Sequence, residues 1–247
     1  MEMKEQISMK QSLYKALKPL YTELLEQLSE EDKSITSPFC VQWGKNFPTT
    51  LFSGLLFVGR ATNGYGTDAT KSVDVLFDGE GDSLGFARPN QMSWLATSTT
   101  NNNYNWRQSP FWRLISKVSQ DYTEGEWFNG IAWSNLCKIA PSEAGNPSDS
   151  LYDAQLSACQ KILKSEIKIL SPKFVILLTG DSWAKDFLSY LDDKKTCSPI
   201  DKVEWGNNYT MEIYLINEVY FLRTEHPQGK PEQSHIEGIK SIIEKYK

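Results

Sequence analysis

Histidine and cysteine are both scarce in this chain. Among its 247 residues there are two histidines and four cysteines. The cysteines are widely scattered and show no short paired spacing: Cys40, Cys137, Cys159 and Cys197. This scatter favours neither a zinc site nor a disulfide framework. We therefore expect no metal and reduced thiols in a cytoplasmic protein.

The sequence also lacks long hydrophobic runs and an excess of positive charge. No apolar stretch is long enough to span a bilayer, and the first six residues lack the apolar core of a signal peptide, so we expect no membrane partner. The formal net charge is −5. Proteins that bind duplexes usually carry a basic patch, because releasing condensed counterions supplies much of their affinity. The charge therefore counts against extensive phosphate contact, although it is compatible with a local basic rim.

A phosphate-binding glycine motif is missing as well. Gly59, Gly64 and Gly66 follow an apolar segment, but they do not form G-x-G-x-x-G, and no Gly-Lys-Ser/Thr follows them. A P-loop is therefore poorly supported. The spacing alone favours a turn that reverses the chain, while the backbone amides of such a turn could also bind an anion or a base.

What is present is an alternation of apolar strands and amphipathic helices. The predicted strands are 55–60, 130–137, 174–178, 211–216 and 219–224, of which 211–216 is an edge hairpin partner. The predicted helices are 6–30, 110–121, 148–170, 181–191 and 232–245, with Ser109 capping the second and Pro172 ending the third. Strands buried on both faces indicate a mainly parallel sheet covered by helices, so we predict an α/β fold.

Polar residues follow three of these strands. Ligands bind beyond the carboxyl ends of strands in open α/β sheets, so these ends predict one cleft. The amide of Asn135 matches the N3–H and carbonyl edge of a pyrimidine, and it would equally serve to cap a turn. His226, followed by Pro227, could stabilise a leaving base or act as a general acid, or it could be structural. His235, within the last helix, is interpreted as structural.

Together these strand ends resemble the uracil-DNA glycosylase superfamily, most closely its bacterial and archaeal iron–sulfur branch. The matching segments, over about residues 52–246, are Gly59-Arg60-Ala61-Thr62-Asn63 for Gly-Glu-Ala-Pro-Gly, Asn135-Leu136-Cys137-Lys138 with Pro141 for Asn-Val-Val-Lys, and His226-Pro227 for the final His-Pro. Phe111-Trp112-Arg113-Leu114 is similar to the Phe-Trp-x-x-Leu helix start of related branches.

The resemblance implies a three-layer α/β/α sandwich around a short, mainly parallel four-stranded sheet. It implies a single domain over 1–247, with 1–50 as an N-terminal helical extension. By position, Asn135 would read the base and His226 would stabilise the departing base anion. The remaining residues of the base site would be Gly59, Arg60, Ala61 and Tyr65.

The departures from the family pattern concern catalysis. Arg60 stands where the iron–sulfur branch has its acidic residue, and Ala61 stands where other branches have Asn or Asp. Asn63 and Asp68 are the candidates to orient the attacking water instead. Of the four cysteine ligands of that branch, only Cys159 is in register, so we predict no cluster and no other cofactor.

Two main hypotheses follow for function. The first is a monofunctional DNA glycosylase that hydrolyses the N-glycosidic bond of uracil or another damaged base, with DNA as its partner. The second is a catalytically inactive module that binds a nucleobase or nucleic acid. Asn135 and His226 favour the first, whereas the altered first loop and the acidic charge favour the second. A hydrolase of small molecules on the same sheet is a third hypothesis.

Overall fold

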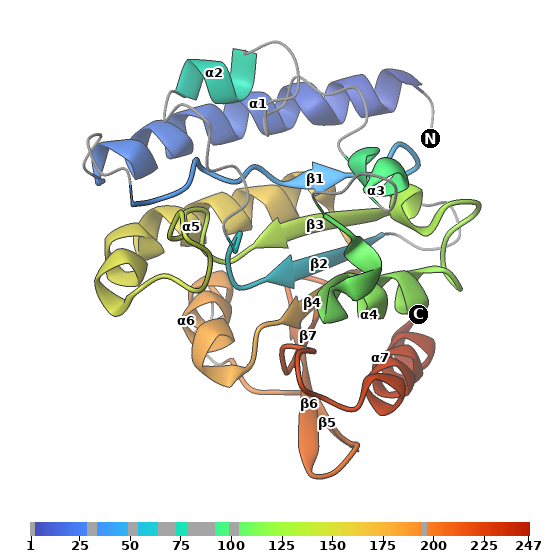
Figure 1. Ribbon diagram of the computed structural model, residues 1–247. Helices are drawn as coiled ribbons and strands as arrows, with labels where there is room; N and C mark the ends of the chain where they lie inside the picture. Colours follow the sequence, from blue (N-terminus) through green and yellow to red (C-terminus); the bar gives the residue numbers. More distant parts are fainter. Residues whose placement is uncertain are drawn as a thin grey trace.

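The computed structural model describes residues 3–28, 34–48, 54–63, 73–78, 92–98, 104–193 and 197–247. These residues form a central sheet with helices against both of its faces (Figure 1). The helices are α1 (Met3–Glu26), α2 (Val73–Asp78), α3 (Trp94–Thr97), α4 (Pro110–Ser119), α5 (Asp149–Leu170), α6 (Asp181–Leu191) and α7 (Glu232–Tyr246), with short 3₁₀ turns η1 (Trp106–Gln108) and η2 (Trp127–Gly130).

The sheet has seven strands among the described residues, in the order β1-β3-β2-β4-β7-β6-β5. Their bounds are β1 (Gln42–Trp43), β2 (Leu55–Gly59), β3 (Ile131–Asn135), β4 (Phe174–Leu178), β5 (Asp201–Trp205), β6 (Tyr209–Ile216) and β7 (Val219–Thr224). The central strands β3, β2, β4 and β7 pair in parallel. The outer strands β1, β6 and β5 pair antiparallel.

The predicted α/β fold is confirmed, but the predicted number of four strands is wrong. The parallel centre does hold four strands, and three antiparallel strands extend it. β1 is only two residues long, too short to show a pattern. β5 is the outermost strand, and its exposed positions include Lys202 and Glu204, as is common where an edge must resist further pairing.

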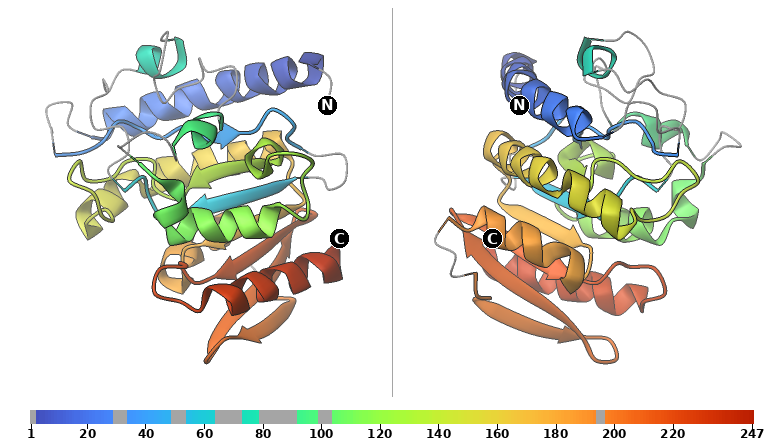
Figure 2. Two further views of the ribbon diagram at one scale, coloured as in Figure 1. Left: turned by 45° about the vertical axis from the view of Figure 1, so that its right-hand side comes forward. Right: turned by 90° about the vertical axis from the view of Figure 1, so that its left-hand side faces the viewer.

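Side chains of the central strands alternate between two hydrophobic cores. Leu56 and Val58 of β2 join the core beneath α1, α5 and α6, whereas Leu55 and Phe57 join the core beneath α4 and α7. This alternation follows from the two-residue period of a strand. Because both faces are covered, β2 and β4 are buried along their whole length. Figure 2 shows the helices on the two sides of the sheet.

The first helix belongs to this packing rather than standing apart. Leu13, Leu17 and Leu24 of α1 are fully buried in the same core as residues of α5. The hydroxyl of Tyr21 donates to the backbone oxygen of Phe39, which ties α1 to the segment that leads into β1. The N-terminal helix therefore contributes to the core of the sheet.

The predicted ends of two helices are confirmed by their caps. The Ser109 hydroxyl accepts from the Trp112 amide, which starts α4 at Pro110. The Ser148 hydroxyl caps α5 in the same way, and α5 ends at Leu170, followed by Ser171 in a left-handed conformation and then Pro172. The start of α4 is important because its first turn carries Phe111 beside the ends of the central strands.

Candidate functional site

The carboxyl ends of β3, β2, β4 and β7 lie along one edge of the sheet. The chain passes from β2 to β3 through α4 on one face, and from β3 to β4 through α5 on the other. The space beyond the ends of β2 and β4 is therefore the topological switch point of the sheet. Open α/β sheets bind their ligands at this place.

The amide of Asn135 lies buried at this edge, against the end of β2. Its side chain is 1% exposed, and its Nδ2 has no hydrogen-bond partner among the described residues. A Cβ on Gly59 would lie 2.5 Å from Asn135 Oδ1 and 3.3 Å from the ring of Phe111. The absence of a side chain at Gly59 thus makes room for both groups. A buried N–H group without a partner is costly, and a ligand at this edge would supply one.

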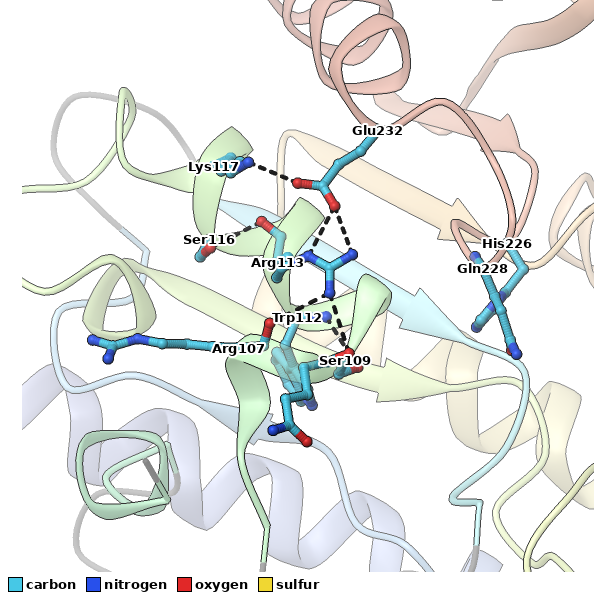
Figure 3. A network of polar contacts seen from close by, with 10 residues as sticks. Arg107, Ser109, Trp112, Arg113, Ser116, Lys117, His226, Gln228 and Glu232 are labelled. Carbon is cyan, nitrogen blue, oxygen red and sulfur yellow. Dashed lines mark hydrogen bonds and ion pairs between the residues drawn. The ribbon is translucent and has the colours of Figure 1, made fainter. Parts of the chain in front are cut away.

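His226 completes this group from the turn after β7. Its ring lies nearly parallel to that of Phe111, with centroids 6.2 Å apart and an interplanar angle of 15°. The backbone N–H of Gln228 donates to His226 Nδ1 at 3.3 Å, and Figure 3 shows both residues on that turn. In the neutral ring the proton therefore resides on Nε2, which makes this atom a donor.

Burial, together with the positive charges of Arg60 and Lys230, lowers the pKa of His226 to about 4. The imidazole is accordingly neutral at pH 7. It can donate a hydrogen bond from Nε2, but it is not protonated to the imidazolium and therefore does not act as a general acid at that pH.

A cluster of ion pairs joins α4, which carries Phe111, to α7, which follows His226. Glu232 accepts from Arg113 Nε at 2.9 Å and from Lys117 Nζ at 2.7 Å (Figure 3). Arg113 also donates to the backbone oxygens of Arg107 and Gln108. Part-exposed ion pairs contribute little to stability on average. Here they connect α4 to the first residue of α7.

A second, fully buried network lies behind Asn135 on the other face of the sheet. Lys138 Nζ donates to Glu166 Oε1 at 2.9 Å and to Ser134 Oγ at 2.6 Å, and all three side chains are 0% exposed. Burial raises the pKa of Glu166, while the charge of Lys138 and the Ser134 hydroxyl oppose this shift. Gln155 of α5 pairs with both the N–H and the C=O of Ile139. These contacts hold the irregular backbone that follows Asn135.

The loop after β2 is held by its backbone and by the Arg60 side chain. Leu136 N–H donates to the oxygen of Gly59, and Cys137 N–H donates to that of Arg60, both at 2.9 Å. Arg60 Nε donates to the backbone oxygen of Thr179 at 2.7 Å, so the side chain bridges the ends of β2 and β4. Ala61 is partly buried and has no polar side-chain group.

The other predicted site residues are not seen in contact with Asn135 or His226 in the described part of the chain. Asn63 is exposed, and its Oδ1 accepts from the backbone N–H of Gly145 at 2.9 Å. Its described side-chain contact is thus with the loop after β3, not with Asn135 or His226. Tyr65 and Asp68 lie outside the described residues. Within the described ranges, no three His, Cys, Asp or Glu side chains are grouped so as to hold a metal ion, and no helix is long and apolar enough to cross a membrane.

Comparison with known families is consistent with this arrangement. A family model described as the uracil DNA glycosylase superfamily matches residues 53–231. The chain belongs to the uracil-DNA glycosylase superfamily. The match runs from the residues just before β2 to the turn after His226, and it therefore includes Gly59, Phe111 and Asn135. No curated protein matches the chain.

Phe111 is the site residue that the sequence analysis did not assign. The signal was present, because the Phe-Trp-x-x-Leu start resembles that of related branches of the superfamily. The segment alone does not show that the Phe111 ring reaches both Gly59 and His226, which depends on how α4 packs against the sheet.

From the pKa values of the two histidines we predict how the stability of the fold depends on pH. Their pKa values fall from 6.5 to about 4 for His226 and about 3 for His235, in both cases chiefly through burial. Below pH 6.5 the unfolded chain therefore binds protons that the folded chain does not. The contribution of the two neutral histidines to the free energy of unfolding is fully present above pH 6.5, and it is lost as the pH falls toward their folded-state pKa values of about 4 and 3.

Histidine NMR signals provide the measurement. Both ring signals of the folded protein should titrate below pH 5, with His226→Ala used for assignment. Lys230→Gln should raise the pKa of His226, because it removes a repelling positive charge. A His226 signal that titrates near pH 6.5 would contradict a partly buried imidazole that is neutral at pH 7.

Proposed function

We propose that this protein hydrolyses the N-glycosidic bond of uracil or another damaged base in DNA. The observation that carries the proposal is the buried Asn135 Nδ2, which has no partner among the described residues, near Phe111, whose ring in turn stacks with the neutral His226. A nucleobase meets the requirements of these groups. It has a flat face for the Phe111 ring and carbonyl oxygens for two donors.

Each group has a role in this reaction. Asn135 donates to one carbonyl of the base and fixes its orientation, while Phe111 stacks on its face. As the bond from the base to the sugar C1′ breaks, the electron pair leaves with the base, and a carbonyl oxygen gains negative charge. His226 Nε2–H then donates to this oxygen. Such prearranged donors are typically worth about 3 kcal/mol in the transition state.

A binding module without turnover is the second candidate, and one observation favours it. In the described part of the loop after β2, Arg60 binds the Thr179 oxygen, Ala61 has no polar group and Asn63 binds Gly145. None of these three presents an obvious group to activate water. The base pocket is the same in both candidates, so binding and turnover are measured separately.

Binding of free bases tests the pocket directly. Calorimetry with uracil should show that Asn135→Ala weakens binding about 10- to 100-fold, since a specific pair of hydrogen bonds to a base is worth about 1–3 kcal/mol. Asn207→Ala, an exposed amide in the turn between β5 and β6, is the matched control and should bind like the wild type. Equal affinity of the Asn135 variant and the wild type would show that this amide does not read the base.

A further inference from the structure

Glu225 places a carboxylate at the same strand ends as His226. It follows Thr224, the last residue of β7, and its side chain is 37% exposed. A Cβ on Gly180 would lie 3.6 Å from Glu225 Oε2 and 3.4 Å from Arg60 Nη2. The carboxylate and the guanidinium thus share the space over the end of β4, at the switch point of the sheet.

Two cations flank this carboxylate. Lys230 Nζ lies 4.0 Å from Glu225 Oε2. On the other side, Arg60 is fixed by its bond to the Thr179 oxygen, and its guanidinium lies 5.8 Å from the centre of the Trp183 ring. Gly180 has φ +81° and no side chain to cover the strand end. Glu225 therefore lies near two cations, and part of its side chain stays exposed to solvent.

A carboxylate in this position has two possible roles in the hydrolysis of a glycosidic bond. The sugar develops positive charge as the bond breaks, and the attacking water must lose a proton. Asp181, another carboxylate at this edge, forms a close ion pair with Arg223, whereas the contact of Glu225 with Lys230 is longer, at 4.0 Å. In the part of the chain that the structure describes, Glu225 is thus better placed than Asp181 or the loop after β2 to supply this charge.

We propose that Glu225 is the catalytic carboxylate of this site, which orients the attacking water and stabilises the positive charge of the sugar. This assignment rests on the N-glycosidase function proposed above. The bond between C1′ and the base nitrogen breaks, and its electron pair leaves on the base, where His226 stabilises it. The water oxygen bonds to C1′ on the face of the sugar opposite the departing base, and the proton that the water loses passes to Glu225. Arg60 and Lys230 are positioning residues for the carboxylate.

Single-turnover base release separates this assignment from the function itself. With uracil-containing single-stranded DNA and excess protein, Glu225→Gln should release uracil about 100-fold more slowly than the wild type, the lower range for general acid–base catalysis. It should bind free uracil within a few-fold of the wild type, because the base pocket is intact. Asp181→Asn is the matched control and should release uracil at the wild-type rate.

The possible results lead to different conclusions. If the wild type releases base and Glu225→Gln releases it at the same rate, the Glu225 assignment is overturned and the proposed function stands. If the folded wild type releases none, the proposed function fails and the assignment fails with it. If Glu225→Gln loses release and free-uracil affinity together, its role is in holding the base, which also overturns the assignment.

A charged sugar analogue gives a second readout that a merely structural role would not change. An abasic oligonucleotide with a cationic pyrrolidine in place of the sugar mimics the positive charge, and a tetrahydrofuran oligonucleotide is its neutral counterpart. With free uracil present, Glu225→Gln should bind the pyrrolidine oligonucleotide about 10-fold more weakly and the tetrahydrofuran one unchanged. Equal weakening of both would contradict a charge-stabilising carboxylate.

Discussion

Gly59→Ala should slow base release about 1,000-fold and remove measurable binding of free uracil, while the protein remains folded. The added Cβ would lie 2.5 Å from Asn135 Oδ1, a distance that real Cβ atoms do not show. The Asn135 amide is the far end of a side chain, so it moves away and the backbone keeps its place. The loss combines a misplaced reacting base, which alone can cost about 100-fold, with the lost hydrogen bonds to its edge.

The measurements for this variant are single-turnover release, calorimetry with uracil and thermal unfolding. Gly125→Ala is a suitable control, because Gly125 has φ +73° and open space around its Cα. That control should lose about 1 kcal/mol of stability through its left-handed backbone and keep base binding. Undiminished uracil binding by Gly59→Ala would show that the space between β2 and Asn135 is not part of the base site.

The central strands and the main helices were predictable because their signals are local. Phe174–Leu178 is a continuous apolar run and forms β4 with both faces covered. The Ser109 and Ser148 caps start α4 and α5 where their sequences indicate. The outer strand β5 was not predicted, because charged and apolar residues share it and its pairing with β6 decides its structure.

In the candidate site, too, residues with a local sequence signal were predictable, and residues placed by contacts between distant segments were not. Asn135 and His226 were assigned from sequence because each is a polar residue at or just beyond the end of an apolar strand. Phe111 and Glu225 were not, since their placement depends on α4 and on the end of β4, which are distant in the chain. The sequence places Arg60 after β2, but the direction of its side chain, toward Thr179, follows from the neighbouring strand. Contacts between separate strand ends are a property of the packed sheet.

The central claim is that the site at these strand ends breaks an N-glycosidic bond, with His226 stabilising the departing base. The direct measurement is single-turnover release with excess protein on oligonucleotides that carry uracil, hypoxanthine or a thymine mismatch. His226→Ala is compared with the wild type, and Gln233→Ala, an exposed side chain of α7, is the control.

We expect the wild type and Gln233→Ala to release base at the same rate from one of these substrates. His226→Ala should remain folded and release that base about 1,000-fold more slowly, as is typical when a donor to a developing anion is removed. Release by His226→Ala at the wild-type rate would contradict the role of His226. No release from any substrate by folded wild-type protein would contradict the enzyme itself and leave a base-binding module.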